Sequence, residues 1–304
     1  MASGLNPDGT RASSATMHVD ARSPQRLEPR AHAKPWGRHG LGAWGLGFAS
    51  DGAAGDPIGE IHHGPACGGD PELLVKTLFT GERLSVQVHP DTAFALAQGH
   101  RRGKDEAWVV LAAEPDARIG LGLSESLDAA ALRAAALDGS IVDRIIWHPC
   151  APGDFFFTPA GTIHAIGAGV TLFEVQQNND VTYRLHDYGR DRELHLDAAL
   201  QVADGASWSR PAPFASPGQG RELLVEGPGF VLERVAIDGA GTLSPVDGRP
   251  AWVAIVSGDG LLGGAAFATG EVWLAETAAA ITGMAEILIA YPGAGAAVDL
   301  WRSS

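Results

Sequence analysis

The chain has 304 residues and a formal net charge of −14, and 45% of its residues are hydrophobic. This length is enough for one large core or for two smaller ones. The strong negative charge argues against nucleic acid and against an anionic membrane surface as partners. No apolar run is long enough to cross a bilayer, so the sequence predicts a soluble globular protein.

The cysteines and the N-terminal segment bear on where the protein works. Only Cys67 and Cys150 are present, which is too few for a disulfide framework, so we expect a cytoplasmic protein. Residues 1–33 lack hydrophobic periodicity and have no signal-peptide core, so they are predicted to form a disordered tail. Met17 is an alternative start for a shorter chain. A monomer or a weak homo-oligomer is expected.

The distribution of turn residues favours an all-β fold in two units. Forty Gly and 19 Pro are spread along the chain, and many turns are typical of β-sandwiches and barrels. Residues 34–204 are predicted to form one β domain with the candidate site. Residues 205–220 are rich in Ser, Pro and Gly and are predicted to be a linker. Residues 221–304 alternate short apolar strands with Gly turns, which predicts a second, smaller β-sandwich.

Helices are expected only as short insertions. Over residues 124–140 apolar residues recur at helical spacing, Ser124 or Ser126 can cap the start, and Gly139 can end the helix. A second short helix is predicted around residues 197–203.

The stretch S-V-Q-V-H-P at residues 85–90 is predicted to be a strand at the centre of a site. Its alternation places Gln87 and His89 on one face. The next predicted strand, K-D-E-A-W-V-V-L, places Lys104 and Glu106 on one face as well. We expect the two strands to be neighbours, so that their polar faces form one wall.

His164 follows a Gly- and Pro-rich turn and completes a Gln/His/Glu/His set with Gln87, His89 and Glu106. A single His on a strand is usually an ordinary polar residue, but this combination is typical of a metal site. Two imidazoles, one carboxylate and one amide oxygen suit zinc, which can polarise a sugar oxygen. We expect one zinc ion per chain. No His or Cys follows His195, so the C-terminal unit is not expected to hold another such site.

Four further polar residues are candidates for the chemistry of the site: Lys76, Lys104, Glu174 and Arg184. Burial of Lys76 in an apolar run is unfavourable unless a partner compensates its charge, and the alternative is that it reaches the surface. For Glu174 the alternative is a carboxylate paired with an arginine. Motifs for dinucleotides, for nucleoside triphosphates and for serine hydrolases are absent.

Four motifs occur in the order of a known enzyme family: L-V-K-T-L-F-T-G-E-R-L-S-V-Q-V-H-P-D, G-K-D-E-A-W, P-A-G-T-I-H-A-I-G-A-G and E-V-Q-Q-N-N-D-V-T-Y-R-L-H-D-Y-G-R. Over residues 34–203 the chain resembles the type I mannose-6-phosphate isomerases, particularly the short bacterial form. The resemblance implies a cupin jelly-roll β-barrel with a metal inside, followed by a degenerate cupin-like unit. Two positions depart from it. His62 and His63 lie where many relatives have Trp, and Asp105 stands where many have Pro or Thr.

The resemblance also implies an activity, the reversible interconversion of mannose 6-phosphate and fructose 6-phosphate. It implies that zinc is held by Gln87, His89, Glu106 and His164. The positions that line the active site of the family are matched by Lys76, Lys104, Glu174 and Arg184.

The sequence leaves several roles open. Lys104 and Glu174 are rival candidates for the base that moves the proton, and Arg184 would orient the substrate. Candidates for binding the phosphate are Lys76, Arg101, Arg102 and Arg190. Two other functions are possible, a metal-dependent cupin dioxygenase and a non-catalytic sugar-phosphate-binding protein, but Gln87 and Lys104 favour sugar chemistry.

Overall fold

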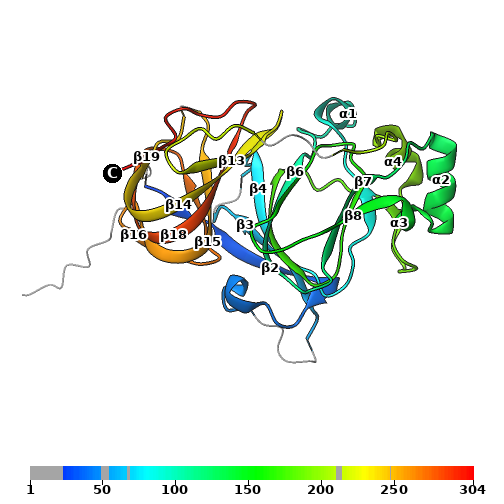
Figure 1. Ribbon diagram of the computed structural model, residues 1–304, viewed down its shortest axis with the longest axis horizontal. Coiled ribbons are helices and arrows are strands. Elements are labelled where there is room, and N and C mark those ends of the chain that lie inside the picture. Colours follow the sequence, from blue (N-terminus) through cyan, green and yellow to red (C-terminus); the bar gives the residue numbers. More distant parts are fainter. Residues whose placement is uncertain (1–22, 49–54, 67–68, 210–213, 247) are drawn as a thin grey trace, which may run out of the picture.

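The computed structural model describes residues 23–48, 55–66, 69–209, 214–246 and 248–304. Within these ranges the strands form three sheets, and their named pairs are antiparallel, which confirms the predicted all-β fold. Figure 1 shows two β-lobes side by side, the N-terminal lobe in cyan to green and the C-terminal lobe in yellow to red. Among the described helices, none is both long and apolar enough to span a bilayer.

Two sheets face each other in the N-terminal lobe, and we call them the inner and the outer sheet. The inner sheet faces the C-terminal lobe and has the order β2 (Glu28–Arg38), β3 (Ile58–Gly64), β4 (Leu73–Phe79), β11 (Val170–Gln177), β6 (Glu106–Ala113) and β9 (Phe155–Thr158). The outer sheet has the order β12 (Tyr183–His186), β5 (Val86–Val88), β10 (His164–Ile166), β7 (Arg118–Leu123) and β8 (Ile145–Pro149).

The C-terminal lobe is built on the third sheet. Its order is β1 (Gln25–Arg26), β17 (Val272–Ala275), β15 (Ala251–Leu262), β18 (Ala279–Pro292), β14 (Phe230–Leu243) and β13 (Arg221–Glu226). Two short strands lie off this path: β16 (Ala265–Ala268) and β19 (Trp301–Ser303). The first of these pairs with β15 and the second with β14.

The helices of residues 129–144 and 196–202 cover the far side of the outer sheet (Figure 1). The helical segments are η1 (Gly42–Gly45), α1 (Thr92–Ala97), α2 (Ala129–Asp138), α3 (Ile141–Arg144) and α4 (Leu196–Val202). The predicted helix exists as α2, and Gly139 ends it in the left-handed region with φ 83°. Its cap is Asp128, whose side chain accepts a hydrogen bond from Ala131 N at 2.8 Å. The predicted serine cap is therefore wrong.

The serines fail as caps because other segments use their hydroxyl groups. Ser124 Oγ donates to Arg144 O at 3.0 Å, and Ser126 Oγ accepts from Ser207 N at 3.1 Å. The helix therefore begins later in the chain than its apolar pattern suggested. The short helix predicted around residues 197–203 is confirmed by α4.

The central strands of the inner sheet, β4, β11 and β6, are buried on both faces, which explains their nearly continuous apolar sequence. Alternate residues of β6, such as Val109, pack against C-terminal-lobe residues such as Leu232 and Trp252 in one shared core. The residues between them, such as Trp108, face the outer sheet and pack in a separate core. The polar side chains of the site share this second face.

The prediction that the strands of Gln87 and Glu106 are neighbours is wrong. Strand β5 pairs with β10 and β12 in the outer sheet, whereas β6 pairs with β9 and β11 in the inner sheet. The two strands therefore face each other. The connection between them holds the unpredicted helix α1, which carries the chain from one sheet to the other.

The prediction of a disordered tail over residues 1–33 is wrong for residues 25–33, which lie in β1 and β2. Strand β1 pairs with β17 in the C-terminal lobe, and β2 pairs with β3 in the N-terminal lobe. Most side chains here are exposed or half-buried, so strand formation depends on backbone pairing and leaves no apolar alternation to detect. Residues 1–22, with Met17, lie outside the described residues. The domain boundaries at residues 204 and 220 stay a prediction.

Candidate metal centre and cavity

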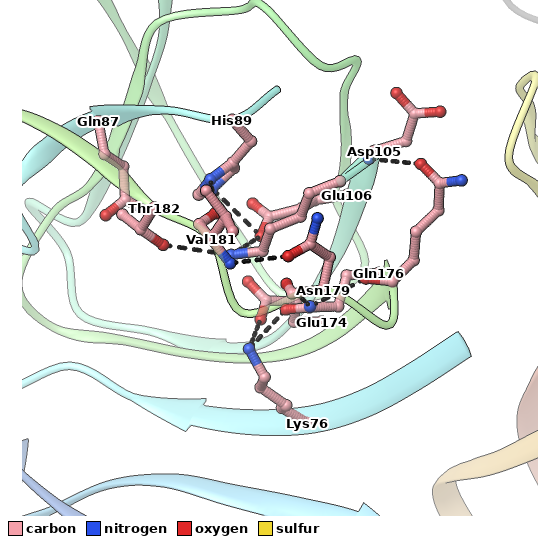
Figure 2. A network of polar contacts seen from close by, with 12 residues as sticks. Lys76, Gln87, His89, Asp105, Glu106, Glu174, Gln176, Asn179, Val181 and Thr182 are labelled. Carbon is pink, nitrogen blue, oxygen red and sulfur yellow. Dashed lines mark hydrogen bonds and ion pairs between the residues drawn. The ribbon is translucent and has the colours of Figure 1, made fainter. Parts of the chain in front are cut away.

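The side chains of His89, Glu106 and His164 converge between the inner and the outer sheet. One potential ligand atom from each lies within 4.8 Å of the others, and all three residues are buried. Figure 2 shows His89 and Glu106 approaching each other from the two sides. Strand pairing places Gln87 directly opposite His164 in the outer sheet, so the four predicted residues meet in one place.

Backbone carbonyl groups fix the orientation of both imidazole rings. His89 Nδ1 lies 2.9 Å from Val181 O, and His164 Nδ1 lies 2.9 Å from Thr162 O. A ring that donates from Nδ1 has its lone pair on Nε2, which is then free to bind a metal ion. Burial lowers the pKa of His89 to about 4 and also lowers the pKa of His164. Both rings are therefore held in the neutral form that a metal requires.

The acceptor atoms of the cluster face one another, which suits a cation between them. His89 Nε2 lies 3.3 Å from Glu106 Oε1, and His164 Nε2 lies 3.6 Å from Glu106 Oε2. Among the described residues, His89 Nε2 and Glu106 Oε2 are buried polar atoms without a hydrogen-bond donor. Burial raises the pKa of Glu106, but the charge of Lys104 holds it well below its usual range. A carboxylate and two imidazole nitrogens thus fit a divalent transition metal.

Gln87 lies at the edge of this cluster. Its Nε2 is 3.2 Å from His164 Nε2, and its Oε1 accepts a hydrogen bond from Ser85 Oγ at 3.1 Å. A half-turn of the amide would exchange the two atoms and present the oxygen to the cluster. Gln87 is therefore placed to serve as the fourth ligand.

Lys76 and Glu174 form a buried ion pair on the inner sheet. They are directly opposite in the register of β4 and β11, and Lys76 Nζ lies 2.9 Å from Glu174 Oε1. The other carboxylate oxygen accepts from Trp108 Nε1 at 3.0 Å. Burial alone would lower the pKa of Lys76, but the charges of Glu174 and Glu60 raise it above its ordinary value. Lys76 is only 7% exposed, so the surface-reaching alternative is wrong, and the partner of Glu174 is a lysine.

A cavity of about 290 Å³ lies beside the metal-competent cluster. Its lining includes the predicted Gln87, Lys76, Lys104, Glu106, Glu174 and Arg184. Lys104 Nζ lies 3.0 Å from Glu106 Oε1 and 3.4 Å from Thr182 Oγ1. Arg184 pairs with Gln87 in the strand register and donates from Nη1 to Glu193 O at 2.6 Å. The structure thus brings the predicted polar residues to one cavity.

The cavity also has polar lining residues that the sequence did not single out as site residues: Lys34, Glu60, His62 and Arg192. Glu60 Oε2 lies 2.7 Å from His62 Nε2 and 3.2 Å from Lys34 Nζ. Although burial raises the pKa of Glu60, the hydrogen bond to His62 and the charge of Lys76 lower it to about 2. The G-E-I-H-H departure was a signal for His62, whereas Lys34 lies at the boundary of the predicted tail.

Three arginines proposed for phosphate binding lie outside the cavity lining. Arg101 and Arg102 form ion pairs with Asp70 at 2.7 and 2.8 Å. Arg190 pairs with Asp187 at 3.0 Å. Neighbouring acidic groups outside the cavity engage these arginines, an arrangement that their sequence positions do not reveal. Of the residues considered for phosphate, Lys76 does line the cavity.

The sequence of this chain is similar to sequences of curated mannose-6-phosphate isomerases. A comparison with known protein families found no match. The chain is 37% identical over 176 residues to a mannose-6-phosphate isomerase of Streptococcus mutans, covering 55% of each chain. It is 37% identical over 145 residues to the mannose-6-phosphate isomerase ManA of Bacillus subtilis, covering 43% of this chain and 44% of that relative. The matched region thus spans about half the length of these curated relatives.

Solved structures extend the likeness to nearly the whole fold. The mannose 6-phosphate isomerase from Bacillus subtilis superposes with a TM-score of 0.74 at 23% identity, covering 88% of this chain and 99% of that one. A phosphomannose isomerase variant from Salmonella typhimurium gives a TM-score of 0.67 at 14% identity, covering 89% of this chain and 100% of that one. These likenesses confirm the predicted fold, a cupin β-barrel followed by a second β unit. The resemblance to mannose-6-phosphate isomerases is confirmed, over about half the chain in sequence and over most of it in fold.

Proposed function

We propose that this protein is a zinc-dependent aldose–ketose isomerase that interconverts mannose 6-phosphate and fructose 6-phosphate. The observation that carries the proposal is the buried His89–Glu106–His164 cluster at the side of a 290 Å³ polar cavity. The names of the curated relatives and of the solved structures with the same fold support this substrate.

The charges of the cavity suit a small anionic substrate. The protein has a net charge of −14, so a sugar phosphate requires local cations to bind. The cavity supplies them in the side chains of Lys34, Lys76, Lys104, Arg184 and Arg192. Glu60 and Glu174 are already paired with lysines, and the lining contains more cationic than acidic side chains, which favours an added negative charge.

We propose that Gln87, His89, Glu106 and His164 hold the metal. A zinc ion bound there would act as a Lewis acid toward negative charge that develops on substrate oxygens. A proton must then leave C2 of the aldose, and a proton must reach C1, with a negatively charged enediolate between the two steps. Lys104 and Glu174 both line the cavity, and either can carry this proton. Arg184 would orient the substrate through its planar guanidinium group.

A coupled isomerase assay on the purified protein tests the activity. Turnover of both sugar phosphates is expected, to be lost after chelation and restored by zinc rather than by iron. His89→Ala is expected to lose both bound zinc and at least about a hundredfold in turnover, while His100→Ala, at an exposed loop position, keeps both. Absence of turnover with zinc bound would contradict the proposal, and binding without turnover would indicate a sugar-phosphate-binding protein.

We also propose that the protein works in the cytoplasm. Cys150 is a free thiol, and burial raises its pKa to about 11, which keeps it protonated and unreactive. Oligomeric state stays a prediction. Fractionation of cells that produce the protein would test its location directly.

A further inference from the structure

Asp105 lies between Lys104 and Glu106 but points the other way. Lys104 and Glu106 line the cavity, and Figure 2 shows the Asp105 carboxylate directed away from His89 and Glu106. The residue is nevertheless only 6% exposed. A buried carboxylate away from the reacting centre requires its own set of hydrogen-bond donors.

One donor to Asp105 belongs to the loop that leads into His164. Ala160 N donates to Asp105 Oδ1 at 2.8 Å. Two residues further on, Thr162 O accepts from His164 Nδ1 at 2.9 Å. The loop of residues 160–162 therefore connects the strand that carries Glu106 to the backbone carbonyl that orients His164. Within the same loop Gly161 N donates to the backbone carbonyl of His89 at 2.9 Å, so the backbone of the third metal-competent residue is attached to this loop as well.

The backbone of Asp105 is held by the end of β11. Its N–H donates to Gln177 Oε1 at 3.0 Å, and Gln177 N donates to Asp105 O at 3.1 Å. These bonds fix both sides of the residue that precedes Glu106. The start of β6 is therefore constrained by its neighbour strand and by the loop of Ala160 together.

The C-terminal lobe closes this junction from outside. Gly229 lies in the turn between β13 and β14, where a Cβ would come within 2.6 Å of Gln177 Cδ and 2.9 Å of Asp105 Oδ2. Only a residue without a side chain fits there without displacing the two partners. The turn of the C-terminal lobe thus packs directly on the residues that position Glu106.

We propose that Asp105 is a positioning residue that holds the metal ligands Glu106 and His164 at their mutual distance, and that Gly229 of the C-terminal lobe keeps Asp105 and Gln177 in place. The inference rests on the metal site proposed above. It gives the C-terminal lobe a role in metal affinity although that lobe contributes no ligand. Groups hydrogen-bonded to metal ligands, as Thr162 O is to His164, typically change metal affinity about 10- to 100-fold when they are altered, and Asp105 acts on this group through the backbone of its loop.

Zinc affinity of the metal-free protein, measured by competition with a chromophoric chelator, tests the role of Asp105. We expect Asp105→Ala to weaken zinc binding about 10- to 100-fold. Asp105→Asn keeps an acceptor for Ala160 N and is expected to restore most of the affinity. The matched control is Asp154→Ala, because Asp154 Oδ2 likewise accepts from a backbone N–H, that of Ala151 at 2.8 Å, in an exposed turn. This control is expected to bind zinc like the unmodified protein.

The contribution of the C-terminal lobe is tested by Gly229→Ala. The added methyl group must displace Gln177 or Asp105, so zinc affinity is expected to fall several-fold. Gly295→Ala is the control, since a Cβ at Gly295 would meet nothing within 4 Å. Unfolding curves of each metal-free variant separate a loss of stability from a loss of affinity.

Three results would overturn this inference, and they can be told apart. If Asp105→Ala loses stability but binds zinc within about twofold of the unmodified protein, the residue has only a structural role. If Asp105→Ala does not fold, zinc affinity of Gly229→Ala equal to that of Gly295→Ala overturns the proposed coupling. If the unmodified protein binds no zinc, the proposed metal site itself fails.

Discussion

At the scale of single residues, the centre of this protein is an arrangement of acceptors. His89 Nε2 and both oxygens of Glu106 face one another within a buried space, and among the described residues Lys104 provides the adjacent positive charge. Like partial charges at this distance are unfavourable unless a cation lies among them. The residues are therefore arranged for a bound ion more than for the stability of the metal-free chain.

The identity of the base is the first prediction at this scale. Lys104→Met and Glu174→Gln should both retain bound zinc, because neither removes a proposed ligand. The variant that removes the base should lose about 10²- to 10⁴-fold in kcat. Steady-state kinetics of both variants, with zinc content measured in parallel, identifies it. Equal and small losses would show that neither residue carries the proton.

The pH dependence of stability is the second prediction, and it concerns His63. Burial lowers the pKa of this ring to about 3, whereas in the unfolded chain it is near 6.5. Below pH 6.5 His63 is therefore protonated in the unfolded chain but stays neutral in the folded protein. The contribution of His63 is fully present above pH 6.5 and decreases as the pH falls toward 3. Between pH 6.5 and 5 the loss is about 2 kcal/mol in the free energy of unfolding.

Denaturant unfolding of the metal-free protein at pH 6.5 and pH 5 measures this loss. His63→Gln should show a pH dependence smaller by about that amount, whatever its stability at pH 6.5. His100→Gln, at an exposed position, should retain the full pH dependence. An unchanged slope in His63→Gln would contradict the assignment.

The sequence predicted which residues form the centre better than it predicted what surrounds it. Gln87, His89, Glu106 and His164 belong to motifs, and strand alternation places their side chains on polar faces. Lys34 and Arg192 line the same cavity, but no local pattern distinguishes them from Arg101 or Arg190, which do not. Whether an arginine reaches a cavity depends on the path of distant segments, which a single sequence does not reveal.

At the scale of elements, alternation predicted the faces of strands but not their partners. Strands β5 and β6 were expected to pair because they are consecutive, and consecutive strands often do pair. Helix α1 instead carries the chain across to the opposite sheet. The predicted site residues still meet, because strands in two facing sheets can direct their polar side chains into the space between the sheets. Alternation is a property of one strand, whereas pairing is decided by the whole fold.

The cap of α2 gives the prediction at this scale. Asp128→Ala removes the acceptor for Ala131 N and should lower the free energy of unfolding by about 1 kcal/mol. Thermal or denaturant unfolding measures this change. Ser124→Ala is the control, because Ser124 lies outside the helix and its removal should have a smaller effect. If Ser124→Ala lowered the free energy of unfolding more than Asp128→Ala, the serine would be the cap, as the sequence suggested.

At the scale of the whole molecule, the two lobes share a hydrophobic core. Side chains of the inner sheet and of the C-terminal lobe, such as Val109, Phe173 and Leu232, belong to one buried cluster. Burial of this kind supplies a driving force of about 25 cal/mol for each Å² of apolar surface. The lobes are therefore expected to unfold together, although the sequence suggested two domains joined by a linker.

A cavity made in this shared core tests that expectation. Leu232 is fully buried, and Leu232→Ala should lower the free energy of unfolding by about 2–5 kcal/mol. The fluorescence of tryptophans and the release of zinc should report the same single transition. Leu261→Ala, at a position 45% exposed, should change stability by less than about 1 kcal/mol. Two separate transitions would indicate independent domains.

The pairing of β1 with β17 has a consequence for how the chain is made. Strand β2 is followed closely in the chain by its partner β3, whereas the partner of β1 is formed by residues 272–275, which are synthesised much later. Domains generally fold as units during synthesis, beginning from the N-terminus. Here β1 leaves the ribosome long before β17 and stays without its partner until the strands of the C-terminal lobe have been made, so its attachment to that lobe is a late event in folding.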